Sequence, residues 1–321
     1  MAEGFITRRG GVGEEPFEPI QATGGTVSDV NINNVNYRIH TFTNVGNSTF
    51  NVTNAGSDGK VEYLVVAGGG GSGTDGAGGG GGGGAGGYLC SVFGEQSGGP
   101  TAADFPVIVN EGSINVTVGA GGQAKSLGSN GVGENGKNSV FGSVVAIGGG
   151  GGIGAGGNTD NFDVATRMGG SGGGAWCLER ILAANPAELS GFFRFGTQGQ
   201  GNNGGLGRNS VPSNSNQRFS AGGGGASQPG EDTRTDRGAN GGNGIFSSIN
   251  GTSTARGGGG ASGTRNTGQP QGSGGVGGGG NRTQNGTPNT GGGGGGSVGG
   301  SIQGGDGGSG IVIIRYPLEA A

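Results

Sequence analysis

Residues 60–90 read KVEYLVVAGGGGSGTDGAGGGGGGGAGGYLC, and the abrupt change from an apolar strand to glycine within them decides the fold. Residues 60–67, KVEYLVVA, are continuously apolar in their second half, which is typical of a buried strand. The glycines that follow have no side chain to bury, to pair with a charge or to act as a nucleophile. Their role must come from the backbone, which favours a structural or binding protein over an enzyme.

The composition excludes several common classes of protein. Glycine makes up 93 of the 321 residues, while 29% are hydrophobic and 12% are charged, so a conventional core can involve only part of the chain. Collagen needs glycine at every third position and abundant proline, whereas this chain has uninterrupted glycine runs and 10 prolines. Disordered chains are usually rich in charge and proline. Neither class fits.

The charge and the ends of the sequence limit its location and partners. The net charge is −4 and no basic stripe is visible, so no nucleic-acid partner is expected. No apolar stretch approaches the roughly 20 residues of a membrane span, and the N-terminus lacks the apolar segment of a secretory signal. We therefore expect the protein to accumulate in a cytoplasm before it reaches its final destination.

Alternating or continuous apolar residues predict a series of strands separated by turn residues. The predicted strands are residues 35–43, 47–53, 60–67, 88–93, 106–110, 113–118, 140–147 and 310–316. The first three predict an antiparallel meander. Residues 35–317 are interpreted as one glycine-rich domain, followed by a tail at 318–321. The only helical signal is the short segment NPAE at 185–188.

Residues 1–34 are interpreted as an extended N-terminal anchor arm, because their sparse apolar residues cannot fold on themselves. The alternative is a disordered tail. The candidate anchor residues combine apolar and basic side chains: Phe5, Ile6, Arg8, Arg9 and Phe17. Such an arm is suited to docking on another protein.

The glycine runs are predicted to be ordered polyproline II helices packed side by side, because only glycine lets backbones approach closely enough to bond laterally. Flexible linkers are the alternative. The fold class is therefore mostly β and irregular: antiparallel β-sandwich elements combined with a bundle of glycine-rich polyproline II helices. The larger residues inside the runs are expected on outward faces: Ala77, Ala85, Ile153, Ala155, Ser273, Val276 and Val298.

A set of segments in this order resembles the glycine-rich domain of bacteriophage tail fibres and adhesins. The segments are YRIHTFTNVGNSTFNVTNAGSDGKVEYLVVAGGGG at 37–71, GAGGY at 84–88, INVTVGAGG at 114–122, NSVFGSVVAIGGGGG at 138–152, ARGGGGASG at 255–263 and GGSGIVIIRY at 307–316. The resemblance covers about residues 35–317. It implies a virion appendage protein whose polyglycine helices form a sandwich and whose variable loops contact the host surface; it supplies no catalytic residues.

Motifs for catalysis, cofactors or metals are weak. Residues 131–137, GVGENGK, match G-x4-G-K, but Asn138 stands where a phosphate-binding loop needs Ser or Thr, and a strand follows. His40, the only histidine, is interpreted as a pairing residue on a sheet face. Cys90 and Cys177 are interpreted as small buried hydrophobes, with a disulfide between them as the alternative. No cofactor and no metal is expected.

The candidate receptor contacts are loop aromatics and arginines, which offer stacking surfaces and planar donors. They are Phe192, Phe193, Arg194, Phe195 and Arg208, and Phe162 and Trp176 could join them. This chemistry suits a host surface glycan or an outer-membrane protein. The alternative is that these side chains pack the ends of the bundle or a contact between subunits.

Three hypotheses follow. The favoured one is a non-enzymatic bacteriophage virion protein, a tail fibre or receptor-binding adhesin, anchored to other virion proteins through residues 1–34 and able to form homo-oligomers. The second is a decoration or connector protein of the virion, or a self-assembling filament, without a receptor. An ice-binding bundle is the third, but the pure glycine runs lack the regularly spaced small residues of an ice-binding face.

Overall fold

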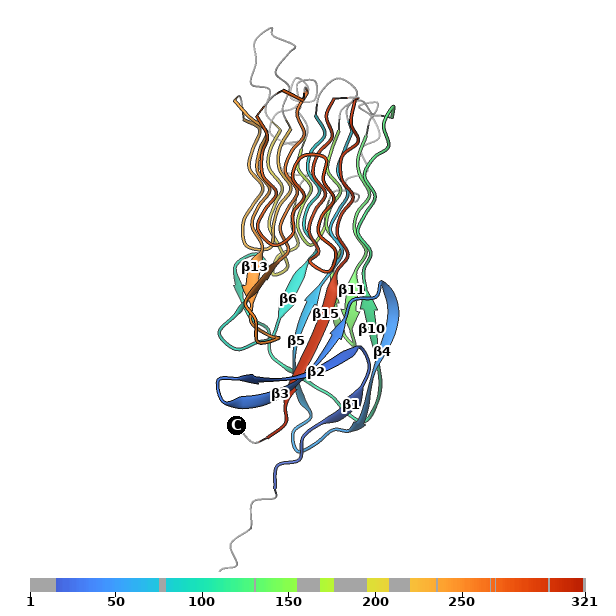
Figure 1. Ribbon diagram of the computed structural model, residues 1–321, viewed down its shortest axis with the longest axis vertical. Helices are drawn as coiled ribbons and strands as arrows, with labels where there is room; N and C mark the ends of the chain where they lie inside the picture. The colour runs from blue at the N-terminus through green and yellow to red at the C-terminus, as the bar shows by residue number, and fades with distance from the viewer. Residues whose placement is uncertain are drawn as a thin grey trace, which may run out of the picture.

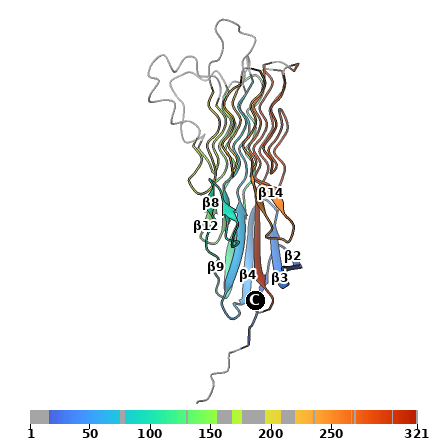
Figure 2. The same cartoon turned by 90° about the vertical axis from the view of Figure 1, so that its left-hand side faces the viewer.

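The computed structural model describes residues 16–74, 79–129, 131–154, 168–175, 195–207, 220–234, 236–265, 267–268, 270–299 and 301–319. The molecule is elongated: a β-sandwich forms one part, and the glycine-rich segments leave it side by side to form the other (Figures 1 and 2). The described residues contain strands and no helix, so the predicted β-rich class is confirmed. The helical signal at 185–188 lies outside the described residues.

Two antiparallel sheets form the sandwich. The five-stranded sheet has the order β1-β4-β10-β11-β12: β1 (Gln21–Thr23), β4 (Gly46–Asn54), β10 (Gly112–Val118), β11 (Ser139–Phe141) and β12 (Val144–Ala146). The larger sheet has the order β2-β3-β15-β5-β6: β2 (Thr26–Ile32), β3 (Val35–Phe42), β15 (Ile311–Pro317), β5 (Lys60–Val66) and β6 (Tyr88–Cys90), with β9 (Val107–Ile108) also paired to β5. Two small hairpins complete the fold: β7 (Gln96–Ser97) with β8 (Thr101–Ala102), and β13 (Ile245–Ser247) with β14 (Thr254–Arg256).

The main core lies between the two sheets. Phe50, Val116 and Phe141 of the five-stranded sheet meet Val65 and Ile314 of the larger sheet, and all are fully or almost fully buried. A second cluster on the opposite face of the larger sheet is covered by the β13 region. The strands β5 and β15 are therefore buried on both faces, which explains their nearly unbroken apolar sequences.

The predicted meander of residues 35–67 is wrong. The C-terminal strand β15 lies between β3 and β5, and β4 belongs to the other sheet, where it lies between β1 and β10. A strand that is apolar on both faces is stable only in the middle of a covered sheet. The sequence of β15 therefore places it at the centre, and β3 and β5 become its neighbours rather than neighbours of β4.

The structure also differs from the expected irregular arm at residues 1–34. Residues 21–32 form β1 and β2, and β2 pairs with β3 from Thr26↔Thr41 to Ile32↔Val35. The turn between these strands has Asn33 and Asn34 at φ 51° and 67°, and such positive angles at both central residues suit the right-handed twist of a hairpin. Asparagine tolerates that conformation, so the NINNVN sequence contains a hairpin that the prediction missed.

The structure also differs from two smaller predictions, the single strand at 140–147 and the tail at 318–321. Residues 140–147 form a hairpin rather than one strand, because Gly142 at φ 55° turns the chain between β11 and β12. At the C-terminus, residues 318 and 319 are attached to the sheet: the amide of Leu318 donates to the carbonyl oxygen of Asn36, and the amide of Asn36 donates to the carboxylate of Glu319.

The glycine segments bond to one another through their backbones in a regular order. In the tract of residues 79–87, the amides of Gly81, Gly84 and Gly87 donate to carbonyl oxygens of one neighbouring tract, residues 147–153. The amides of residues 82 and 85 donate to a second tract, and those of residues 83 and 86 donate to a third. The direction of donation therefore repeats every three residues.

The spaces between these tracts admit no side chain at most positions. A Cβ atom added to Gly81 would overlap the carbonyl oxygen of Gly174, and one added to Gly83 would overlap that of Gly70. The amides of Gly81 and Gly83 donate to Ile153 and Gly294, so the overlapping oxygens of Gly174 and Gly70 belong to other tracts. Each central tract is thus surrounded by neighbouring backbones, and glycine is required because any larger residue would hold them apart.

The expected outward placement of the larger tract residues is only partly right. Ser273 and Val276 are exposed, but Ala85, Ile153 and Val298 are buried. Ile153 and Val298 lie at the ends of their tracts away from the sandwich, where Val298 forms isolated bridges to Thr264 and Ile302. Ala77 and Ala155 lie outside the described residues.

Candidate functional site

Most of the predicted receptor contacts lie outside the described residues. These are Phe192, Phe193, Arg194 and Arg208, together with Phe162 and Trp176. Phe195 is described and is 37% exposed. Its neighbour Gly196 pairs with Gly169, and the next glycine, Gly170, donates to Gly148 directly after β12. Phe195 therefore lies where the tracts leave the sandwich, not at their far ends.

The predicted anchor is described only at its last residue. Phe5, Ile6, Arg8 and Arg9 lie outside the described residues, and Phe17 is partly buried. The chain is fixed immediately afterwards. The amide of Glu18 donates to Ser57 Oγ at 2.8 Å, and the amide of Ser57 donates to the carbonyl oxygen of Glu18 at 2.9 Å.

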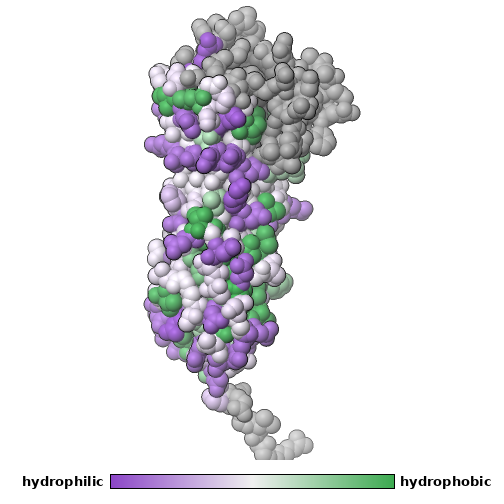
Figure 3. Space-filling model, turned by 90° about the vertical axis from the view of Figure 1, so that its right-hand side faces the viewer, coloured by the Kyte–Doolittle hydropathy of each residue, from purple (hydrophilic) through white to green (hydrophobic). Residues whose placement is uncertain are grey.

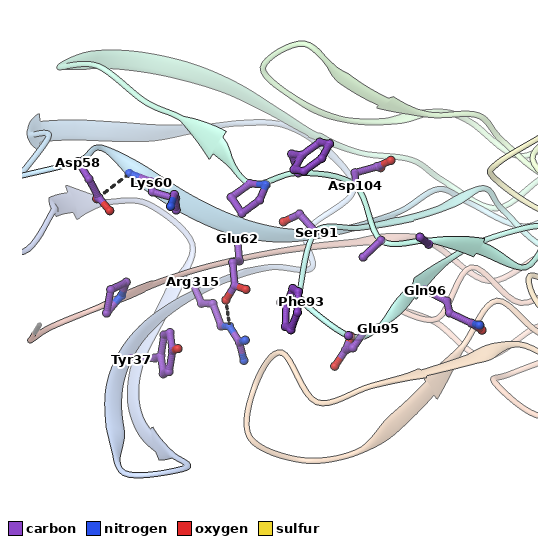
Figure 4. A pocket seen from close by; sticks show the side chains of 16 residues that line it. Tyr37, Asp58, Lys60, Glu62, Ser91, Phe93, Glu95, Gln96, Asp104 and Arg315 are labelled. Carbon is purple, nitrogen blue, oxygen red and sulfur yellow. Dashed lines mark hydrogen bonds and ion pairs between the residues drawn. The ribbon is translucent and has the colours of Figure 1, made fainter. Parts of the chain in front are cut away.

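A groove on the larger sheet is a concave site formed by described residues. Its volume is about 850 Å³, and it is bounded by β3, β5, β15 and the chain between β6 and β9. In Figure 4, Glu62, Arg315 and Phe93 lie near the middle of the groove, with Asp58 at one end and Gln96 at the other. The sequence analysis did not predict this site.

Arg315 forms the floor of the groove. Its Nε donates to Glu62 Oε2 at 2.7 Å, its Nη1 donates to the carbonyl oxygen of Ile249, and its guanidinium lies 4.6 Å from the centre of the Tyr37 ring. The Arg315 side chain is 8% exposed and that of Glu62 is 19% exposed. The positive charge of Arg315 is therefore largely neutralised by Glu62, within the protein.

Two phenylalanines stand at the edge of the groove, nearly free of contact with the rest of the chain. Phe93 is 98% exposed and Phe105 is 91% exposed. Both line the groove. Exposed apolar residues are common when they occur singly, but large aromatic side chains gathered around a cavity point to an interaction site. On the opposite side of the molecule, apolar residues form small separate patches among hydrophilic ones (Figure 3).

The carboxylates of the groove are held in place by hydrogen bonds. Glu95 accepts from the amide of Ser248 and from the thiol of Cys90, and Asp104 accepts from the hydroxyl of Tyr63. Burial raises the pKa of Cys90 to about 12, so this thiol is protonated and unreactive near neutral pH. The positioned acids and aromatics are suited to binding a ligand.

The remaining candidates for chemistry have structural roles. The pKa of His40 is lowered by burial, so its imidazole is neutral. Nδ1 donates to the carbonyl oxygen of Gly24 and Nε2 accepts from the hydroxyl of Tyr316, as a residue pairing on a sheet face would. Cys90 is a free, buried cysteine, and Cys177 lies outside the described residues.

The described residues contain no group of three or more His, Cys, Asp or Glu side chains placed to hold a metal ion. Among the same residues there is also no helix with the length and apolar character needed to cross a membrane. The strand β11 follows the G-x4-G-K match at 131–137, where a phosphate-binding loop would have a helix.

Comparison with models of protein families gives one finding. Residues 43–317 match the model of the glycine-rich domain, which is most of the chain. The chain belongs to the glycine-rich domain family. The match includes the tracts, all strands except β1, β2 and β3, and the lining of the groove apart from Tyr37. A search of curated proteins finds no match.

Proposed function

We propose that the glycine tracts of this glycine-rich domain protein are polyproline II helices that form a rigid bundle. The support is the repeat of hydrogen-bond direction every three residues in the tract 79–87, because a polyproline II helix has three residues per turn. Its rise of about 3.1 Å per residue would make this tract roughly 28 Å long. Such a helix has no internal hydrogen bonds, so its amides are available to neighbouring tracts.

The bundle depends on the sandwich for its stability. Fixing each residue costs about 1–2 kcal/mol, while each hydrogen bond between tracts returns roughly 1 kcal/mol net. These values nearly cancel. The strands β5, β6, β12 and β15 adjoin tracts directly, so their burial in the sandwich holds the first residues of each tract in register.

We infer that the protein is a non-enzymatic component of a bacteriophage virion, a tail fibre or receptor-binding adhesin. The observation that carries this proposal is the long bundle of backbone-bonded tracts projecting from one end of the sandwich (Figure 1). Such a rod suits a protein that holds binding loops away from a particle. The chain upstream of Glu18 would attach to other virion proteins, and the loops would contact a host glycan or outer-membrane protein.

Adsorption of the corresponding phage to its host tests this function. Purified protein should occupy the receptor and reduce adsorption in proportion to its concentration. A variant with Phe193→Ala and Arg194→Ala should compete more weakly, whereas Val276→Ala, on the exposed side of a tract, should compete like the original protein. Phe193 and Arg194 directly precede Phe195, which lies at the sandwich end of the tracts, so this variant tests a contact in that part of the sequence. If the double substitution has no effect, these residues are not the receptor contact, and loops at the far end of the bundle are the next to test.

The alternative proposal is a decoration or connector protein without a receptor. The exposed phenylalanines of the groove favour it, since they suit a contact with another virion protein. Protein that binds to virus particles but leaves adsorption unchanged at saturating concentration would support the connector and reject the adhesin.

A further inference from the structure

We propose that the groove binds the N-terminal segment of the same chain, residues 5–9, with the sequence FITRR. Docking of this segment would cover Phe93 and Phe105 and would hold Arg8 and Arg9 against the carboxylates of the groove. Three observations support the assignment: the place where the chain leaves the fold, the charge of the groove, and the sequence of the segment.

The chain leaves the described fold beside the groove. The hydrogen bonds between Glu18 and Ser57 fix this point, and the next residue after Ser57 is Asp58, which lines one end of the groove (Figure 4). Residues before Phe17 therefore start within a short distance of the site. Phe17 and Arg9 are eight positions apart in the sequence, and an extended chain over that distance spans about 26 Å. Gly10, Gly11 and Gly13 lie in this stretch and let the chain reverse direction.

The groove favours a cationic occupant. Its lining includes four acidic residues and two basic ones, a formal charge of −4 + 2 = −2: Asp58, Glu62, Glu95 and Asp104 against Lys60 and Arg315. Glu62 and Arg315 neutralise each other in the floor. Apart from that pair, the lining contains three carboxylates and one lysine, so arginine side chains would complement its charge.

The segment matches both properties of the groove. In an extended chain, successive side chains point to opposite sides, so Phe5 and Arg9 share one side while Ile6 and Arg8 share the other. Each side of the segment then carries one apolar and one cationic group. The apolar group can pack against the exposed phenylalanines, and the cationic group can pair with the carboxylates.

The linkage between the segment and the groove favours docking within one molecule. A short flexible linker gives an effective concentration in the millimolar range. An affinity of only about 1 mM is then enough for half of the molecules to dock. A second copy at micromolar concentration would need an affinity about a thousandfold higher to reach the same occupancy. If the protein also uses this arm to attach to a virion, as proposed above, attachment must first displace it from the groove.

Trypsin cleavage after Arg8 and Arg9 tests the docking in the full chain. Docked arginines are inaccessible, so release of the N-terminal fragment should be about tenfold slower than cleavage of a synthetic peptide of residues 1–15. The double variant Phe93→Ser and Phe105→Ser should approach the peptide rate. The variant Phe246→Ser, which alters an aromatic side chain 59% exposed on β13, is the matched control and should cleave like the original chain.

A binding measurement makes the result independent of cleavage. Full chain with Arg8→Glu and Arg9→Glu should leave the groove open and bind a fluorescent peptide of residues 1–15, measured by anisotropy. Adding Phe93→Ser and Phe105→Ser should abolish that binding. Cleavage of the original chain at the peptide rate, or no peptide binding to the open variant, overturns the proposal. Protection that grows with protein concentration would also overturn it, because it would show docking between copies.

Discussion

Asn135 Oδ1 accepts the amide hydrogen of Gly151 at 2.8 Å, so a side chain supplies a bond that other tract amides obtain from a backbone carbonyl. Three residues later, Asn138 Oδ1 accepts from Gly148. The same spacing recurs in Asn240 and Asn243, which accept from Ser273 and Val276. The asparagine spacing therefore repeats the three-residue period of the tracts and completes their hydrogen bonding.

Replacing Asn135 with alanine should remove the acceptor of a buried amide. Gly151 is buried, so loss of this bond should lower the free energy of unfolding by about 1 kcal/mol. Hydrogen exchange at the Gly151 amide should accelerate. The control is Asn115→Ala, on an exposed position of β10 where the side chain donates to Thr117. Equal effects of the two substitutions would contradict this role for Asn135.

A single methyl group in the centre of the bundle should be strongly destabilising. Gly83→Ala places a Cβ against the carbonyl oxygen of Gly70 and near the amide of Gly294, and overpacking of this kind costs about 1–3 kcal/mol or more. Chemical denaturation should show a lower midpoint. Gly268→Ala is the matched control, because an added Cβ there meets no atom within 4 Å. If both variants unfold at the original midpoint, the tracts are not closely packed in solution.

The sequence predicted individual strands better than their arrangement. Segments such as residues 60–67 and 310–316 were recognisable because burial on both faces leaves an almost unbroken apolar run. The order of strands depends on pairing between β3 and β15, about 270 residues apart in sequence, and local patterns carry no information on such pairs. The asparagine spacing at 135/138 and 240/243 was visible, but its meaning required knowing which tracts are neighbours.

The groove could not be predicted because its parts are scattered along the chain. Tyr37, Glu62, Phe93 and Arg315 come from separate strands and a connection, and only the sheet order brings them together. The available signal was the presence of Phe93 and Phe105 in otherwise polar or proline-containing segments. The predicted cluster at 192–195 and 208 stays a prediction, since all but Phe195 lies outside the described residues.

Removing one partner of the Arg315–Glu62 pair should lower the free energy of unfolding more than replacing both partners with apolar residues. Glu62→Leu leaves the largely buried guanidinium without its carboxylate, and loss of one partner of such a pair costs about 3 kcal/mol. Glu62→Leu combined with Arg315→Met removes both charges and should recover much of this loss, which paired denaturation curves would measure. A double variant less stable than Glu62→Leu would show that the bonds of Arg315 to Ile249 and Tyr37 dominate.

His40 should make the stability fall as the solution becomes acidic. Burial lowers the pKa of His40 below its ordinary value of 6.5, so below pH 6.5 the unfolded chain binds a proton that the folded chain excludes. The stabilising contribution is complete above that pH and is lost as the pH falls towards the folded pKa, with a slope of at most about 1.4 kcal/mol per pH unit. His40→Gln removes the titrating group and retains a donor for the carbonyl oxygen of Gly24. Since the chain has one histidine, the difference in denaturation midpoint between pH 7.5 and pH 5.5 should be smaller in this variant; an identical difference in both proteins would exclude His40 as the cause.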